Sequence, residues 1–240
     1  MQPTRNLWRW LAVVFFLSFA ALGWLGREIY LAAPPIPKVV TPDGAVLFTK
    51  EQVQDGQRAW LAAGGQQLGT VWGHGSYVAP DWSADWLHRE AVALRDLVAA
   101  RLYNVAFAML QPHQQASVDE IVKTEMRANT YDAATDTLTI SHERAAAISL
   151  VKKHYEGLFG TDASLDKLRE QYAMMPDALP RAEDRHALSG FFFWSAWSAA
   201  TDRPGEKGLS YTSNWPHEPI VGNVLPASAA IWSIVSILLL

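Results

Sequence analysis

The stretch GGQQLGTVWGHGSYVAPDWSADWLHRE, residues 64–90, combines closely spaced glycines with three tryptophans. Glycine permits sharp backbone turns, and Pro80 fixes its own φ angle and pushes Ala79 into an extended conformation. Asp81 or Ser83 can then cap a helix that begins near Ala84. A glycine-rich loop that leads into a long helix either binds a partner or is a structural loop held down by its tryptophans, and both readings stay open from these residues alone.

The composition of the whole chain limits the classes of function. It has 240 residues, half of them apolar, a net charge of −4 and no cysteine. Without thiols it forms no disulfide, thiolate nucleophile, iron–sulfur cluster, cysteine-type zinc site or covalently attached c-type haem. No basic stripe is present, which argues against binding to nucleic acid. Eleven tryptophans are many for this length, and tryptophan belts at membrane interfaces are one common cause.

Two apolar stretches are expected to be membrane helices. Trp10–Gly26 carries no charge and is long enough to cross the core of a bilayer. We expect residues 1–29 to be a retained anchor rather than a signal peptide, because the apolar region is long and Leu31-Ala32-Ala33 is a poor cleavage site. Val224–Leu240 is again uncharged, so residues 221–240 are expected to begin a second membrane helix. The chain is therefore expected to be the front piece of a longer membrane protein.

Residues 30–220, between these stretches, are expected to form one mainly α-helical domain with a small β-hairpin. Capping residues, apolar periodicity, and glycine or proline at the ends set the expected bounds. The expected elements are a helix capped by Thr49 with Gln52 and ended by Gly64–Gly65, a helix over Ala84–Leu110, a helix opened by a capping box at Ser117–Glu120, a hairpin over Thr130–Ile140, a helix from Ser141 to about Leu158, a helix from Ser164 to about Met174, a buried or interfacial helix over Leu188–Thr201, and a polar turn over Asp202–Gly208.

The residue chemistry predicts no catalytic site in this chain. No two of the seven histidines lie three to five residues apart, so no helix face offers a pair of histidine ligands to a metal or haem. No nucleophile elbow, phosphate-binding loop or dinucleotide fingerprint occurs. The histidines are His74, His88, His113, His142, His154, His186 and His217.

Five segments carry a resemblance to a known family. They are DGQRAW (residues 55–60), WGHGSYVAPDW (72–82), DWLHRE (85–90), FFWSAW (192–197) and YTSNWP (211–216). These motifs, rich in tryptophan and glycine, resemble the N-terminal region of quinol-dependent nitric oxide reductases. The resemblance covers nearly the whole chain.

This resemblance implies a membrane-anchored, cytochrome-c-like domain on the periplasmic side of the bacterial cytoplasmic membrane. In the family this domain is fused to a bundle of membrane helices that carries two haems b and a non-haem iron and reduces two NO to N2O and water with electrons from quinol. The expected partners are therefore the downstream catalytic core of the same polypeptide, membrane lipid and quinol. The catalytic residues are expected downstream, so the fragment alone is expected to be inactive.

The resemblance also implies that this domain keeps the cytochrome fold without haem c. The related two-subunit enzymes carry a CxxCH motif near the position of GQQLG, residues 65–69, where both cysteines and the histidine are missing here. An empty pocket of that size would be costly, so side chains are expected to fill it. The candidates for filling it are Trp60, Trp72, Trp82 and Trp86.

A calcium site is the one cofactor site that the resemblance implies within this chain. In the relatives, a glycine carbonyl and a tyrosine of the loop bind a Ca2+ ion that bridges to the catalytic subunit. The matching positions are Gly75 and Tyr77, and oxygen donors suit calcium. The alternative is that Gly75 only turns the chain and Tyr77 only packs.

Two other functions stay open at this stage. The chain could be a stand-alone, membrane-anchored periplasmic binding or scaffold module, in which case the reading frame would stop after Leu240. It could also be a secreted domain that is released by cleavage near Ala33 or Pro34. The role of His217 and Glu218, between two prolines, stays open as well.

Overall fold

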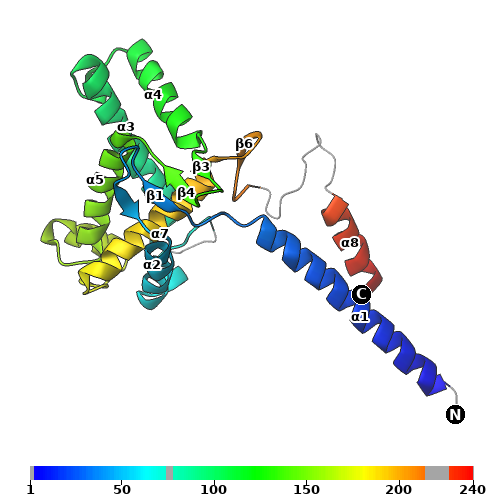
Figure 1. The fold of residues 1–240 in the computed structure, drawn as a ribbon. Coiled ribbons are helices and arrows are strands. Elements are labelled where there is room, and N and C mark those ends of the chain that lie inside the picture. The colour runs from blue at the N-terminus through cyan, green and yellow to red at the C-terminus, as the bar shows by residue number, and fades with distance from the viewer. Residues whose placement is uncertain (1–2, 74–77, 214–226, 240) are drawn as a thin grey trace. The chain divides into compact units, whose positions relative to one another are not determined.

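The computed structural model describes residues 3–73, 78–213 and 227–239 (Figure 1). It divides into two units. One unit is Pro35–Thr212, which contains most of the secondary structure, and the other consists of Met1–Pro34 with Ser213–Leu240. The expectation of a mainly helical chain with small sheets is confirmed.

The described part of the second unit contains apolar helices. Helix α1 spans Pro3–Leu31, and its stretch Asn6–Leu31 is long and apolar enough to cross a membrane by length and composition. It is the single such helix within the described part of the chain. Helix α8 spans Ala227–Leu239 and falls on the second expected membrane stretch. The domain bounds expected from the sequence remain predictions.

Helix α7, Ala182–Ala200, is the centre of the Pro35–Thr212 unit (Figure 1). Helices α2 (Lys50–Ala62), α3 (Trp82–Tyr103) and α5 (His142–Leu158) all pack against it. Because these neighbours cover it on several sides, α7 is apolar around most of its circumference. It is the buried helix expected from the sequence, but it begins six residues before Leu188, since the polar first turn hides its start.

Helices α2 and α7 cross at very close range. The capping box that opens α2 is present, with Thr49 N donating to Gln52 Oε1 at 2.8 Å and Gln52 N to Thr49 Oγ1 at 3.2 Å. A Cβ atom on Gly56 would lie 2.6 Å from the carbonyl carbon of Ala187 and 2.7 Å from Cβ of Phe191. The crossing therefore depends on the missing side chain of Gly56.

The second half of α3 packs with α4 around a second, smaller core, to which Ala147 of α5 also contributes. The expected helix over Ala84–Leu110 ends earlier, at Tyr103, because Asn104 adopts a left-handed conformation with φ 57° and caps it. A 3-10 turn, η2, follows at Phe107–Met109. Helix α4 spans Pro112–Arg127, so its expected start at Ser117 is wrong. Proline fits the first turn of a helix, and Gln111 with Gln114 forms the real capping box.

The expected hairpin is confirmed, but it belongs to a larger sheet. Strands β3 (Tyr131–Asp132) and β4 (Thr137–Thr139) are antiparallel, and β4 also pairs in parallel with β1 (Lys38–Val40). Strand β2 (Val46–Phe48) completes the order β2-β1-β4-β3. Strands of two or three residues give almost no periodic signal, so the sequence did not reveal this sheet.

The remaining elements lie between α5 and the end of the unit. Ser141 caps α5 as expected, since its hydroxyl accepts from Arg144 N at 3.0 Å. Asp162, and not Ser164, then caps the turn η3 (Ala163–Leu165) that precedes the short helix α6 (Asp166–Gln171). The expected polar turn after α7 is a second hairpin of β5 (Asp202–Arg203) and β6 (Glu206–Ser210).

Candidate functional site

An aromatic cluster lies beside residues 65–69, the segment that the sequence analysis compares with a haem-attachment motif. The indole of Trp82 is fully buried and stacks on Phe192, with ring centroids 5.3 Å apart and an interplanar angle of 15°. Gly69 has φ +131°, and a Cβ atom there would lie 2.5 Å from Cε2 of Trp82. The Trp82 ring therefore packs directly against the backbone of Gly69. Tyr155 and Phe159 close the cluster around the same indole.

These residues do not fit a c-type haem. Covalent attachment needs two thiols, and axial ligation needs an imidazole, and residues 65–69 supply neither. The indole of Trp82 occupies the volume next to Gly69, since a Cβ atom on that glycine would collide with its ring.

Three of the four tryptophans proposed as fillers are buried in this way. Trp60, Trp82 and Trp86 are 5%, 0% and 0% exposed. Trp72 lies instead at the rim, where it is half-buried, packs on Trp194 at 5.3 Å and donates its indole N–H to the carbonyl of Ser195 at 2.9 Å. The sequence analysis missed Tyr155, Phe159 and Phe192, although the FFFW run of residues 191–194 was a signal that aromatic side chains gather on α7.

One buried and one partly buried carboxylate accept hydrogen bonds from aromatic groups of the cluster. Glu90 is fully buried and accepts from the indole N–H of Trp86 at 2.9 Å and from Nε of Arg144 at 2.6 Å. Asp85 Oδ2 accepts from the Tyr155 hydroxyl at 2.6 Å and from Nε of Arg89 at 2.8 Å. The Glu90–Arg144 and Asp85–Tyr155 hydrogen bonds connect α3 to α5. Without a hydrogen-bond partner, taking these polar groups out of water would cost free energy.

The same surroundings shift the pKa values of nearby groups. Burial, together with the charge of Asp85, raises the pKa of the Tyr155 phenol well above its ordinary value, so Tyr155 stays protonated. Burial is the largest cause that lowers the pKa of His154 to about 4, and the charge of Arg89 is the second. His154 Nε2 is buried with no hydrogen-bond partner, which agrees with a neutral imidazole.

The loop that precedes α3 has a firmly closed neck. Trp82 N donates to Thr70 O at 2.7 Å, and Thr70 N donates to Pro80 O at 3.2 Å. Asp81 Oδ1 caps α3 through Ala84 N at 3.0 Å, and its Oδ2 accepts from Gly73 N and, at 3.3 Å, from Thr70 Oγ1. Both oxygens of the Asp81 carboxylate are thus occupied in holding the loop closed.

The two expected calcium ligands, Gly75 and Tyr77, belong to residues 74–77 and lie outside the described residues. Their role stays a prediction. Within the part of the chain that the structure describes, no group of three His, Asp or Glu side chains could hold a metal ion. His217 and Glu218 also lie outside the described residues.

The loop neck lies at the end of the unit where the chain enters and leaves it. The indole N–H of Trp194, against which Trp72 packs, donates at 2.8 Å to the carbonyl of Pro35, the first residue of the unit. One turn further along α7, Trp197 packs on Tyr211 at 5.4 Å, next to the last residue of the unit. The loop neck and both chain ends therefore share the end of the unit near residues 194–197 of α7.

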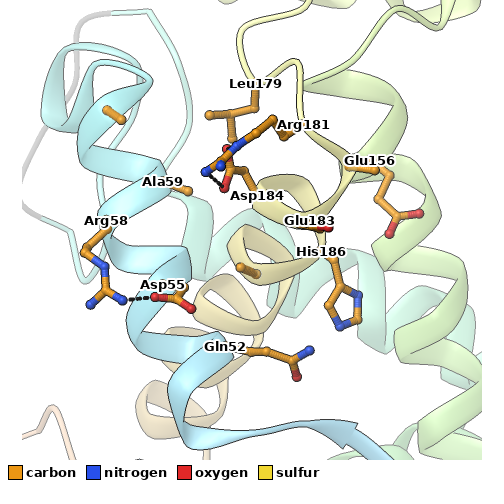
Figure 2. Close-up of a pocket in the computed structure, with 13 residues that line it drawn as sticks. Gln52, Asp55, Arg58, Ala59, Glu156, Leu179, Arg181, Glu183, Asp184 and His186 are labelled. Atoms are coloured by element: carbon orange, nitrogen blue, oxygen red, sulfur yellow. Dashed lines mark hydrogen bonds and ion pairs between the residues drawn. The ribbon is translucent and has the colours of Figure 1, made fainter.

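A surface pocket of about 820 Å³ lies between α2, the start of α7 and the end of α5 (Figure 2). Its charged groups are largely paired with each other, Arg181 with Asp184 at 2.7 Å and Arg58 with Asp55. His186 lies at its edge, and burial lowers the pKa of this imidazole. Neither Asp85 nor Glu90 lines this pocket, and the described residues that line it bring no hydroxyl or thiol nucleophile together with His186.

Comparison with known proteins agrees with this architecture. Residues 36–217 match the family model of the cytochrome c-like domain of NorB, a nitric oxide reductase component. The match covers more than half of the chain and almost all of the Pro35–Thr212 unit. No curated protein matched the chain.

Proposed function

The chain belongs to the family of the NorB cytochrome c-like domain of nitric oxide reductases, and from this premise we propose that it is the N-terminal part of a quinol-dependent nitric oxide reductase. The proposed reaction of the full-length protein takes two NO, two electrons and two protons to N2O and water. The haems b, the non-haem iron and the quinol site belong to downstream membrane helices. Their metals would supply the binding and reduction of NO, and no catalytic residue is assigned to this chain.

The observation that carries the proposal is the burial of Trp82 against Gly69. A family member that received electrons from a soluble cytochrome through haem c would need that space for the porphyrin. Here the space is packed with aromatic rings, which supports electron delivery through the membrane part from quinol. The unit is then a haem-free cap on the catalytic core.

The end of the unit around Trp72 is the proposed docking face for that core. The closed neck of the loop holds residues 78–81 in place, and Val78 is 56% exposed there. Trp72 and Trp194 are half-buried at the same end, and tryptophan is enriched at the centre of protein interfaces. The chain also enters and leaves the unit at this end. We place this face on the periplasmic side of the cytoplasmic membrane.

Calcium binding at Gly75 and Tyr77 remains part of the proposal. A hard cation with oxygen ligands could join the loop to acidic groups of the core. Its test is the calcium content and NO reductase activity of a full-length Tyr77→Phe variant. Loss of calcium with loss of activity is expected, and unchanged values for both would remove the site.

The function itself is tested by the rate of NO consumption of the full-length polypeptide in detergent. A soluble quinol should sustain NO reduction when it is the only electron donor, and reduced cytochrome c should not. Activity with reduced cytochrome c alone, or no NO consumption with either donor, would overturn the proposal.

Two simpler measurements address the alternatives. Further membrane helices with histidines in the reading frame past Leu240 support the reductase, and a stop codon there supports the stand-alone module. A mature protein that begins near Ala33 or Pro34 would favour a secreted domain, and retention of α1 would exclude it.

A further inference from the structure

Four oxidisable aromatic rings lie in a continuous chain of contacts through the cluster. Tyr172 packs edge-on against Trp82 with ring centroids 5.9 Å apart, and Trp82 packs in the same way against Tyr155 at 6.0 Å. Tyr155 stacks on Trp86 at 5.2 Å and 6°. Trp82, Tyr155 and Trp86 are fully buried, whereas Tyr172 is partly exposed at the end of α6. The chain of rings thus joins the core to the surface.

Tyr155, at the centre of this chain, has a proton acceptor in place. Its hydroxyl donates to Asp85 Oδ2 at 2.6 Å, a short hydrogen bond to a charged acceptor. A phenol that loses an electron becomes a strong acid, so a carboxylate at this distance can take the proton as the electron leaves. Trp86 has the same arrangement, because its indole N–H donates to Glu90 at 2.9 Å.

Packing alone does not require these polar groups. Phenylalanine fills other positions of the cluster, among them Phe159 and Phe192, without a buried acceptor. A buried Tyr155 hydroxyl and a partly buried Asp85 carboxylate cost free energy that a phenylalanine and an apolar neighbour would not. Arg89, which donates to the same Asp85 oxygen at 2.8 Å, offsets part of this cost. Oxidation chemistry gives the phenol–carboxylate pair a use beyond packing.

We propose that Tyr172, Trp82, Tyr155 and Trp86 form a relay that carries an oxidising equivalent between the protein surface and the core, with Asp85 holding the phenol proton of Tyr155. A one-electron oxidant such as nitrogen dioxide takes an electron from Tyr172, becoming nitrite, while the Tyr172 proton passes to water. The Tyr172 radical then regains an electron from Tyr155 through Trp82 and a proton from water. Tyr155 becomes a neutral radical, and its proton moves to Asp85.

The absence of cysteine makes the relay directly testable in the full chain. A single Gln171→Cys substitution, on the exposed last residue of α6, gives a unique site for a ruthenium polypyridyl label next to Tyr172. Flash excitation with a soluble quencher makes the label a one-electron oxidant. In Tyr155→Phe the radical should stay on Tyr172, whereas in the parent protein we expect the EPR spectrum of a Tyr155 radical. It should be retained in the matched control Tyr103→Phe, at the end of α3 outside the cluster.

Two further variants separate the relay from a structural role. Asp85→Asn keeps an oxygen that accepts from the phenol but cannot take its proton, so the Tyr155 radical and its slower formation in D2O should both disappear. Trp82→Phe keeps an aromatic ring in the gap but breaks the relay, so the radical should stay on Tyr172. Circular dichroism confirms that each variant is folded. A radical confined to Tyr172 in the parent protein, or an unchanged yield of the Tyr155 radical in Asp85→Asn and Trp82→Phe, would overturn the proposal.

Discussion

Substitution of Gly56 by alanine tests the crossing of α2 and α7 on which the unit is built. The new Cβ would lie 2.6 Å from the carbonyl carbon of Ala187, about 0.8 Å inside the 3.4 Å at which ordinary van der Waals contact begins. The obstacle is helix backbone, which cannot rotate away as a side chain can. The two helices must therefore separate, and the aromatic contacts beyond the crossing must open with them.

The size of the effect follows from two opposing contributions. Forcing a methyl group into a packed core costs about 3 kcal/mol at the upper end of the usual range. Alanine in place of glycine inside a helix returns about 1 kcal/mol. We expect Gly56→Ala to lower the free energy of unfolding by about 2 kcal/mol, the difference between these contributions.

Urea unfolding of the full chain in detergent measures this change. The near-ultraviolet circular dichroism of the buried tryptophans monitors the transition. The matched control is Gln57→Ala, the next residue of α2, which is exposed and should leave the midpoint within error. A Gly56→Ala protein as stable as its parent, or more stable, would show that helix propensity outweighs the close crossing and would refute the reasoning.

Three further predictions concern groups around the aromatic cluster. Glu90→Gln leaves Arg144 buried without its charged partner and should lower the free energy of unfolding by about 3–5 kcal/mol. In a double-mutant cycle, Glu90→Gln combined with Arg144→Met should lower it by much less than the sum of the two single changes. The pKa of His154 is lowered from 6.5 to about 4 in the folded protein, so the unfolded state takes up a proton first as the pH falls. The stability that the neutral imidazole contributes is therefore full above pH 6.5 and is lost between pH 6.5 and 4. Unfolding free energies across that window should fall less steeply in His154→Gln, and an identical slope would contradict this assignment. Asp81→Ala removes the cap of α3 together with its bonds to the loop, so it should cost about 1 kcal/mol or more and speed proteolysis near residues 70–81.

Local signals in the sequence were sufficient for several elements. The Thr49 capping box and the Ser141 cap involve residues only three apart, and both helices begin where these signals lie. The start of α4 was misplaced because two capping boxes compete, and Pro112 fits the first turn of the helix that the earlier box opens. Such competition is decided by packing, since Val118 and Val122 must face α3.

The sites formed by distant segments were harder to foresee. The burial of Trp82 was expected once residues 65–69 were compared with a haem-attachment segment, but its neighbours come from α5 and α7. The parallel pairing of Lys38–Val40 with Thr137–Thr139, and the contact of Gly56 with Ala187, join segments that have no periodic relation in the sequence. Trp72 was expected in the filled pocket because sequence gives composition and spacing without direction, and its side chain turns to the rim instead.

The central claim is that the chain's own aromatic side chains occupy the space beside Gly69 that a haem would need. Titration of the purified chain with haemin, followed by the Soret absorption and the emission of the buried tryptophans, tests this claim most directly. The account predicts no saturable complex and unchanged tryptophan emission. One haem bound per chain, with quenching of the buried tryptophans, would contradict it.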